Sequence, residues 1–218
     1  QGISEAVLNL HHLPETITRE VGHGDGCNLR VRYSWEPTLL GTAGGPRQAL
    51  PLLGSRFFIV NGDTLTDLSL RALAEQHEKM QTQVTLAVTP HPNPERYGGV
   101  EIDNAGRVIQ FRSADVASSR HFIGVQLAEA TAFTEVQTGQ PAASIGGIYE
   151  NLIAKRAAAV GAVTVNASFR DVGTPSDYLA TTLAVAEAEK HSSPVVGVDT
   201  SIHPSTTLTR TAVWDRVV

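Results

Sequence analysis

The sequence predicts an α/β protein with a doubly wound, mostly parallel, Rossmann-like sheet, followed by the start of a hexapeptide β-helix. Short apolar segments alternate with helical patterns along most of the chain, as in βαβ units. The segment 57–60 has four apolar residues in succession, which indicates a strand buried on both faces. Near the C-terminus, Val196, Ile202, Leu208 and Trp214 recur at intervals of six. This period is typical of a β-helix, although four apolar residues can also fall so by accident.

The amino-acid composition limits the classes of protein to which the chain can belong. With 41% apolar and 18% charged residues among 218, the chain is globular. A net charge of −5 gives no basic footprint for nucleic acid, and no apolar run is as long as a membrane span. Cys27 is the single cysteine, which excludes an intrachain disulfide and fits a reducing cytoplasm. We therefore expect a cytoplasmic protein with neither nucleic-acid nor membrane partners, and a homo-oligomer stays open.

Local signals place the elements in chain order. Pro14 suits the first turn of a short helix after the first strand, and Asp67 or Ser69 can cap a helix at 70–80. Ser176 is the expected N-cap of a last helix at 176–190. The expected strands are 6–10, 29–34, 57–60, 83–89, a hairpin of 97–103 with 107–111, 121–127 and 162–165; the other helical segments are 47–53 and 148–159.

The chain divides into two expected domains, residues 1–190 and 195–218, joined by a short linker at 191–194. The second contains the hexad pattern. It is too short to bury a core alone, because a solenoid needs about three or more repeats. We expect the pattern to continue beyond Val218.

The turn Asn61-Gly62-Asp63 ends the strand at 57–60. Gly62 permits a tight turn, and ligands of open α/β sheets bind at the carboxyl ends of strands. A carboxylate there can hold a divalent cation against phosphate oxygens. An ordinary turn, with the Asp as its hydrogen-bonding residue, explains the same pattern equally well.

The segment Leu40-Gly41-Thr42-Ala43-Gly44 is a loop of small residues that leads into a helical pattern. Such a loop lets backbone N–H groups approach a flat or anionic ligand closely. A plain connection from strand to helix accounts for the loop slightly better when the segment is taken by itself.

Several segments together resemble the sugar-nucleotide pyrophosphorylase (nucleotidyltransferase) family, in particular its mannose-1-phosphate guanylyltransferases. The resemblance covers nearly the whole chain, and the tail is similar to the left-handed β-helix that many members carry. The segments that carry it, in order, are Glu36 with Leu40–Gly44, Asn61-Gly62-Asp63, Tyr97-Gly98-Gly99-Val100, Phe122-Ile123-Gly124-Val125, and Arg170-Asp171-Val172-Gly173-Thr174-Pro175 with Tyr178.

The resemblance implies transfer of a nucleotidyl group from a nucleoside triphosphate to a sugar 1-phosphate, with release of pyrophosphate; mannose 1-phosphate and GTP are the expected substrates. It implies that Asp63 and Asp171 hold Mg²⁺ and act in catalysis. The implied nucleotide-binding residues are Leu40, Gly41, Thr42, Ala43, Gly44, Asn61 and Gly62. The implied sugar-binding residues are Gly98, Gly99, Phe122, Ile123 and Gly124.

The chain departs from the family pattern in two places. Members open with a strand and a Gly-rich, Arg-bearing loop that wraps the triphosphate, and the chain lacks this segment. We therefore expect a native polypeptide that is longer at its N-terminus, and no activity from these 218 residues alone. Members often have Glu-Lys-Pro where this chain has Phe111-Arg112-Ser113-Ala114-Asp115. Whether Arg112 replaces the missing sugar-phosphate lysine is open.

Three other functions stay open. A metal-dependent glycosyltransferase also places an Asp at a strand end, but usually as Asp-x-Asp, which Asp63-Thr64-Leu65 does not match. A non-catalytic, sugar-nucleotide-binding regulatory subunit fits the missing lysine, whereas Asp63 and Asp171 argue for catalysis. An acyltransferase built on the hexapeptide tail is the third.

Overall fold

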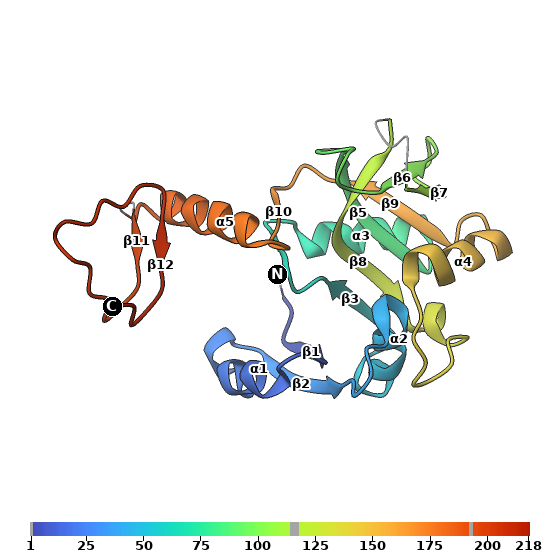
Figure 1. The fold of residues 1–218 in the computed structure, drawn as a ribbon. Helices are drawn as coiled ribbons and strands as arrows, with labels where there is room; N and C mark the ends of the chain where they lie inside the picture. Colours follow the sequence, from blue (N-terminus) through green and yellow to red (C-terminus); the bar gives the residue numbers. More distant parts are fainter. Residues whose placement is uncertain (1, 114–117, 192–193) are drawn as a thin grey trace. The chain divides into compact units, whose positions relative to one another are not determined.

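The computed structural model describes residues 2–113, 118–191 and 194–218 (Figure 1). Ala114 and Asp115, which the sequence analysis singled out, lie outside these ranges. The chain forms two compact units: unit 1 comprises Gln1–Asn61 and Leu68–Ala167, and unit 2 comprises Gly62–Asp67 and Ser168–Val218. This division differs from the predicted domains at 1–190 and 195–218, which remain a prediction. No helix within the described ranges is both long and apolar enough to cross a membrane.

Unit 1 is built on a six-stranded sheet with the order β7-β6-β8-β5-β9, in which β3 also pairs with β8. Four strands run in one direction, whereas β7 and β8 run in the other. The predicted α/β fold with a mainly parallel sheet is confirmed. The strand expected at 121–127 is β8, and its antiparallel direction between β3 and β5 was not predicted. The strands are β3 (Arg56–Val60), β5 (Val84–Pro90), β6 (Gly99–Ile102), β7 (Val108–Arg112), β8 (Arg120–Glu129) and β9 (Val160–Thr164).

The core of unit 1 lies on both faces of β5, whose residues Val84–Val88 are all fully buried. The Thr85 hydroxyl is hydrogen-bonded to Nδ1 of His77, which belongs to α3 (Leu70–Met80), at 2.7 Å. Gln126 of β8 accepts a hydrogen bond from Tyr149, the first residue of α4 (Tyr149–Lys155), at 2.7 Å. Thr85 pairs with Leu127 in the sheet, and adjacent strand residues point to opposite faces. Therefore α3 and α4 cover opposite faces of the sheet.

A second, two-stranded sheet in unit 1 joins β1 (Glu5–Leu10) and β2 (Arg30–Trp35) in parallel. Among the described strands, β1 pairs only with β2 and β3 pairs only with β8. A groove of about 100 Å³ is lined by β1, β3 and α2 (Gly41–Ala49). Val60 of β3 is 49% exposed, so the prediction of a strand buried on both faces is wrong at this end, because β3 has a strand on one side only.

Three helix boundaries differ from prediction. The helix expected at 47–53 is α2, which begins at Gly41 and ends at Ala49. The helix expected at 148–159 is α4, which ends at Lys155 because Arg156 adopts an extended backbone and the chain turns into β9. The N-cap of α5 (Pro175–Ala188) is Thr174 rather than Ser176: the Thr174 hydroxyl accepts the Asp177 N–H at 3.2 Å. Pro175, which lacks an N–H, then occupies the first helical turn. The other helices of unit 1 are α1 (Pro14–Val21) and short turns at Asp25–Cys27, Leu50–Leu52, Ala130–Phe133 and Ser144–Ile148.

Unit 2 contains two small strand pairs and α5. β4 (Thr64–Thr66) pairs antiparallel with β10 (Phe169–Asp171). β11 (Val195–Val196) pairs in parallel with β12 (Ala212–Val213), so that Val195 lies beside Ala212. One such parallel rung is compatible with a β-helix, and the predicted hexapeptide repeat stays a prediction.

Candidate active site

The segment Leu40–Gly44 is the first turn of α2 rather than a loop, which corrects the sequence prediction. Glu36 explains the early start of the helix. Its buried carboxylate, 3% exposed, accepts the Leu40 N–H at 3.0 Å and the Asn9 side-chain amide at 2.9 Å. A carboxylate at a helix N-terminus interacts favourably with the helix dipole. Glu36 therefore fixes where α2 begins.

Most of this turn is already hydrogen-bonded within the protein. The N–H groups of Ala43 and Gly44 donate to the Ala142 carbonyl at 2.9 and 3.3 Å. Thr42 Oγ1 accepts the Ser144 N–H at 2.8 Å. These N–H groups are therefore not aimed at a ligand, which is the role that the small residues suggested. Within the turn, Gly41 and Thr42 are exposed.

Two of the predicted binding residues meet at the carboxyl end of β3. The Asn61 N–H, directly after β3, donates to the Gly124 carbonyl of β8 at 2.8 Å. Gly124 has a φ of +79°, a backbone conformation that glycine adopts without strain. The neighbouring Ile123 side chain is fully buried, so it does not face a ligand, and Phe122 packs partly against the core. The structure thus joins one residue predicted to bind the nucleotide, Asn61, to one predicted to bind the sugar, Gly124.

A cavity of about 460 Å³ surrounds Gly98, whereas Gly99 is buried in β6. Its lining combines two aromatic rings, two guanidinium groups and two carboxylates. The Arg96 guanidinium lies over the Tyr97 ring, 5.0 Å from its centre. The complete lining is Pro94, Glu95, Arg96, Tyr97, Gly98, Phe111, Arg112, Ser113, Ile145, Gly146 and Glu150. This mixture of groups suits a polyhydroxylated ring that carries a phosphate.

Arg112 is held in this cavity by Glu101. The Arg112 Nε and Nη2 atoms both donate to Glu101 Oε2, at 2.7 and 2.6 Å. Hydrogen bonds from Gln110 and Arg112 lower the pKa of the Glu101 carboxyl. Glu150, in contrast, directs both carboxylate oxygens to the backbone N–H groups of Gly146 and Gly147, at 2.8 and 2.9 Å. No role was predicted for Glu101 or Glu150, because their partners lie outside any recognisable motif.

Unit 2 brings the backbones of Asp63 and Asp171 together. The Val172 N–H donates to the Asp63 carbonyl at 2.9 Å, and Asp171 lies opposite Thr64 in the β4–β10 pair. Asp63 is exposed and Asp171 half-buried. No group of three or more His, Cys, Asp or Glu side chains suited to a metal occurs among the described residues. Two carboxylates nevertheless form a donor set that suits Mg²⁺, which usually keeps several waters and takes phosphate oxygens.

A family model described as nucleotidyl transferase matches residues 1–188, and the chain belongs to this family. It is 25% identical over 181 residues to a mannose-1-phosphate guanylyltransferase of Mycobacterium tuberculosis, covering 82% of this chain and 50% of that protein. It is 27% identical to a D-glycero-alpha-D-manno-heptose 1-phosphate guanylyltransferase of Campylobacter jejuni, covering 82% of this chain and 77% of that protein. The chain thus spans half the length of the mycobacterial relative.

Solved structures confirm the fold. The crystal structure of HddC from Yersinia pseudotuberculosis superposes with a TM-score of 0.70 at 20% identity, covering 84% of this chain and 80% of that chain. A complex of HddC with GMP-PN superposes with a TM-score of 0.65 at 20% identity, covering 82% and 77% of the two chains.

Proposed function

We propose that this protein is a sugar-1-phosphate nucleotidyltransferase. The observation that carries the proposal is the β4–β10 pair together with the bond from the Val172 N–H to the Asp63 carbonyl, which bring the backbones of Asp63 and Asp171 together although more than a hundred residues separate them. Membership of the nucleotidyl transferase family supports the reaction class. The metal-dependent glycosyltransferase and the acyltransferase have no comparable support.

The reaction joins two substrates at one phosphorus atom. An oxygen of the sugar 1-phosphate forms a bond to the α-phosphorus of the nucleoside triphosphate, and the bond from that phosphorus to the bridging oxygen of the β-phosphate breaks. Pyrophosphate leaves with the electron pair. Asp63 and Asp171 would hold Mg²⁺, which supplies positive charge to phosphate oxygens. Transfer of this kind depends mainly on positioning and on neutralisation of charge.

The remaining roles go to two parts of unit 1. Gly41 and Thr42, at the exposed side of the first turn of α2, would border the nucleotide. The cavity at Gly98 would take the sugar, with the Arg112 guanidinium near its phosphate. We propose GTP as the nucleotide and mannose 1-phosphate as the sugar. Two relatives named as guanylyltransferases support the base, although another relative, from Neisseria meningitidis, is named as a uridylyltransferase of N-acetylmuramate 1-phosphate.

The test measures pyrophosphate release by the full-length protein with GTP, mannose 1-phosphate and Mg²⁺. Asp63→Asn keeps the shape of the side chain but removes its charge. We expect a loss of several kcal/mol of transition-state stabilisation, or roughly two to three orders of magnitude in rate. Asp171→Asn should lose about as much, and the double variant little more, because both residues act through one ion.

Asp67→Asn is the matched control. Asp67 Oδ1 accepts the Ser168 N–H at 2.8 Å next to the same strand pair, and an asparagine oxygen can keep this bond. The control loses the same charge and should retain the activity. Full activity in Asp63→Asn, or an equal loss in Asp67→Asn, would contradict the assignment of the metal-binding residues.

One observation favours a second function, a non-catalytic subunit that binds a sugar nucleotide. Arg112 stands where relatives often have a lysine, and Glu101 neutralises it. In that case GDP-mannose would bind to the full-length protein, while pyrophosphate release would stay at background. Isothermal titration with GDP-mannose beside the activity assay separates the two functions.

A further inference from the structure

A second cavity, of about 530 Å³, lies at the opposite ends of the central strands from Asn61 and Gly124. Gln83, which lines it, directly precedes β5, and Thr131, which also lines it, closely follows β8. Asn61 directly follows β3, which runs in the same direction as β5, and Gly124 lies in the first half of β8. A seven-residue strand such as β5 is roughly 20 Å long. The cavity is therefore distant from Asn61 and Gly124.

The lining of this cavity combines an apolar floor with polar side chains that carry no net charge. Ala132 and Val136 are buried, and Ile148 and Leu152 pack partly against the core. The rim carries four carboxamide side chains, those of Gln83, Gln137, Gln140 and Asn151. The charged residues of the lining are Glu135 and Lys155, and they form an ion pair with each other. The lining therefore has no net charge.

We propose that this cavity binds an uncharged heterocycle of nucleoside size. An apolar floor suits the face of a flat ring, and carboxamides both donate and accept hydrogen bonds, as the edge of a nucleobase requires. The volume lies in the range of small-molecule sites. A nucleoside triphosphate does not fit this chemistry, because the Lys155 ammonium is already neutralised by Glu135.

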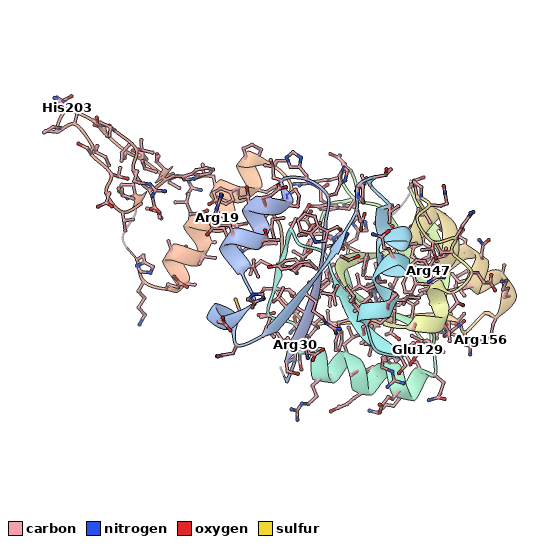
Figure 2. The ribbon with its side chains drawn as sticks, turned by 90° about the horizontal axis from the view of Figure 1, so that it is seen from below. Arg19, Arg30, Arg47, Glu129, Arg156 and His203 are labelled. Carbon is pink, nitrogen blue, oxygen red and sulfur yellow. The ribbon has the colours of Figure 1, made fainter. Side chains whose placement is uncertain are left out.

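The wall of this cavity also supports the first turn of α2. The Ala142 carbonyl accepts the N–H groups of Ala43 and Gly44, and the Val136 carbonyl accepts Arg47 Nε at 2.9 Å; Figure 2 labels Arg47 on α2. A Cβ atom at Gly44 would lie 2.7 Å from the Gln140 carbonyl oxygen, so contact between the wall and the helix is close. A ligand in the cavity thus stabilises the turn that would border the nucleotide. This coupling to nucleotide binding, and the use of GTP below to occupy the nucleotide site, rest on the proposed function.

Binding is tested with the full-length protein and four probes: adenosine, guanosine, cytidine and uridine. Saturation-transfer NMR measures binding in the presence of excess GTP, which occupies the nucleotide site. Asn151→Trp places an indole in the cavity and should weaken binding at least tenfold. Ala154→Trp is the matched control, because Ala154 is exposed on the same helix, α4, and does not line the cavity.

We expect at least one nucleoside to bind the wild type and Ala154→Trp, and not Asn151→Trp. Absence of binding by all four nucleosides would overturn the proposal. Equal binding to Asn151→Trp, or a signal that GTP abolishes, would overturn it too. None of these readouts depends on catalysis, so they remain informative if nucleotidyl transfer is not observed.

Coupling is tested by amide hydrogen exchange of the peptide that covers 41–49. The bound nucleoside should slow this exchange at least threefold in the wild type and leave it unchanged in Asn151→Trp. Unchanged exchange in the wild type with nucleoside bound would overturn the coupling.

Discussion

α3 and α5 begin in the same way, yet they differ completely in burial. The Ser69 hydroxyl accepts the Ala72 N–H at the start of α3, and the Thr174 hydroxyl accepts the Asp177 N–H at the start of α5, both at 3.2 Å. α3 buries Leu73 and His77 against the sheet of unit 1, each only 1% exposed. No residue of α5 is buried.

The difference shows that local chemistry determines where a helix starts, whereas its neighbours determine how strongly it is held. The apolar residues of α3 lie on one side, which the sheet covers. The apolar residues of α5 are spread around the helix, and Tyr178 remains 46% exposed although its ring contacts Trp214. We therefore expect substitutions in α3 to affect global stability and substitutions in α5 to act locally.

The largest expected effect separates the two helices directly. Leu73→Ala removes a fully buried side chain and should lower the free energy of unfolding by about 2–5 kcal/mol. Leu183→Ala, at a half-buried position of α5, should lower it by less than about 1 kcal/mol. Urea denaturation followed by circular dichroism measures both. Equal losses would show that α5 is packed as firmly as α3.

His77 gives α3 a pH dependence. Burial lowers the pKa of His77 below its usual 6.5, against the opposing effect of Glu129, whose carboxylate lies 3.2 Å from Nε2; Arg56 lowers and Glu78 raises this pKa. The unfolded chain thus binds a proton more readily than the folded one. Neutral His77 therefore contributes fully to the free energy of unfolding above pH 6.5, the pKa of the unfolded chain. This contribution is lost as the pH falls from 6.5 through the lower pKa of the folded state, by at most about 1.4 kcal/mol per pH unit.

Urea denaturation between pH 7.5 and 5 measures this loss, and His77→Gln should flatten the profile in that range. The pKa of Glu129 is also lowered, below its usual 4.5, so its own titration falls outside most of this range. A His77→Gln profile as steep as that of the wild type would assign the dependence to other groups.

The smallest effect concerns the two caps. Ser69→Ala and Thr174→Ala each remove one hydrogen bond to a helix N-terminus, worth about 1 kcal/mol. Ser69→Ala should shift global denaturation, whereas Thr174→Ala should speed amide exchange in α5 alone. A shift in global denaturation from Thr174→Ala would mean that unit 2 unfolds together with unit 1.

Local patterns predicted much of the secondary structure. The strand at 57–60 and the helix at 70–80 follow from runs of apolar residues and from Ser69, all within a few positions of one another. The direction of β8 could not be predicted, because periodicity gives the faces of a strand but not its orientation. The exposure of Val60 also depends on which strand lies beside β3.

The candidate site was less accessible to sequence reasoning. Its residues were found by resemblance, but their contacts were not. The bond between Ser144 and Thr42 joins positions 102 residues apart, and no local pattern marks it. The internal bonds of Ala43 and Gly44 likewise depend on Ala142. Small residues predict that another group can come close to the backbone, but they do not show whether that group is a ligand or another part of the protein.

The separation of the two aspartates along the chain has a consequence for folding. β4 meets β10 only after about a hundred intervening residues have been looped out, since Thr66 bonds to Ser168 across 102 positions. Closing a loop of this length has an entropy term of about 4 kcal/mol, and pairings so distant in sequence form slowly. Three-residue strands recover little of that free energy by themselves. The pair should therefore form late, and it should separate in local openings that leave the central sheet intact.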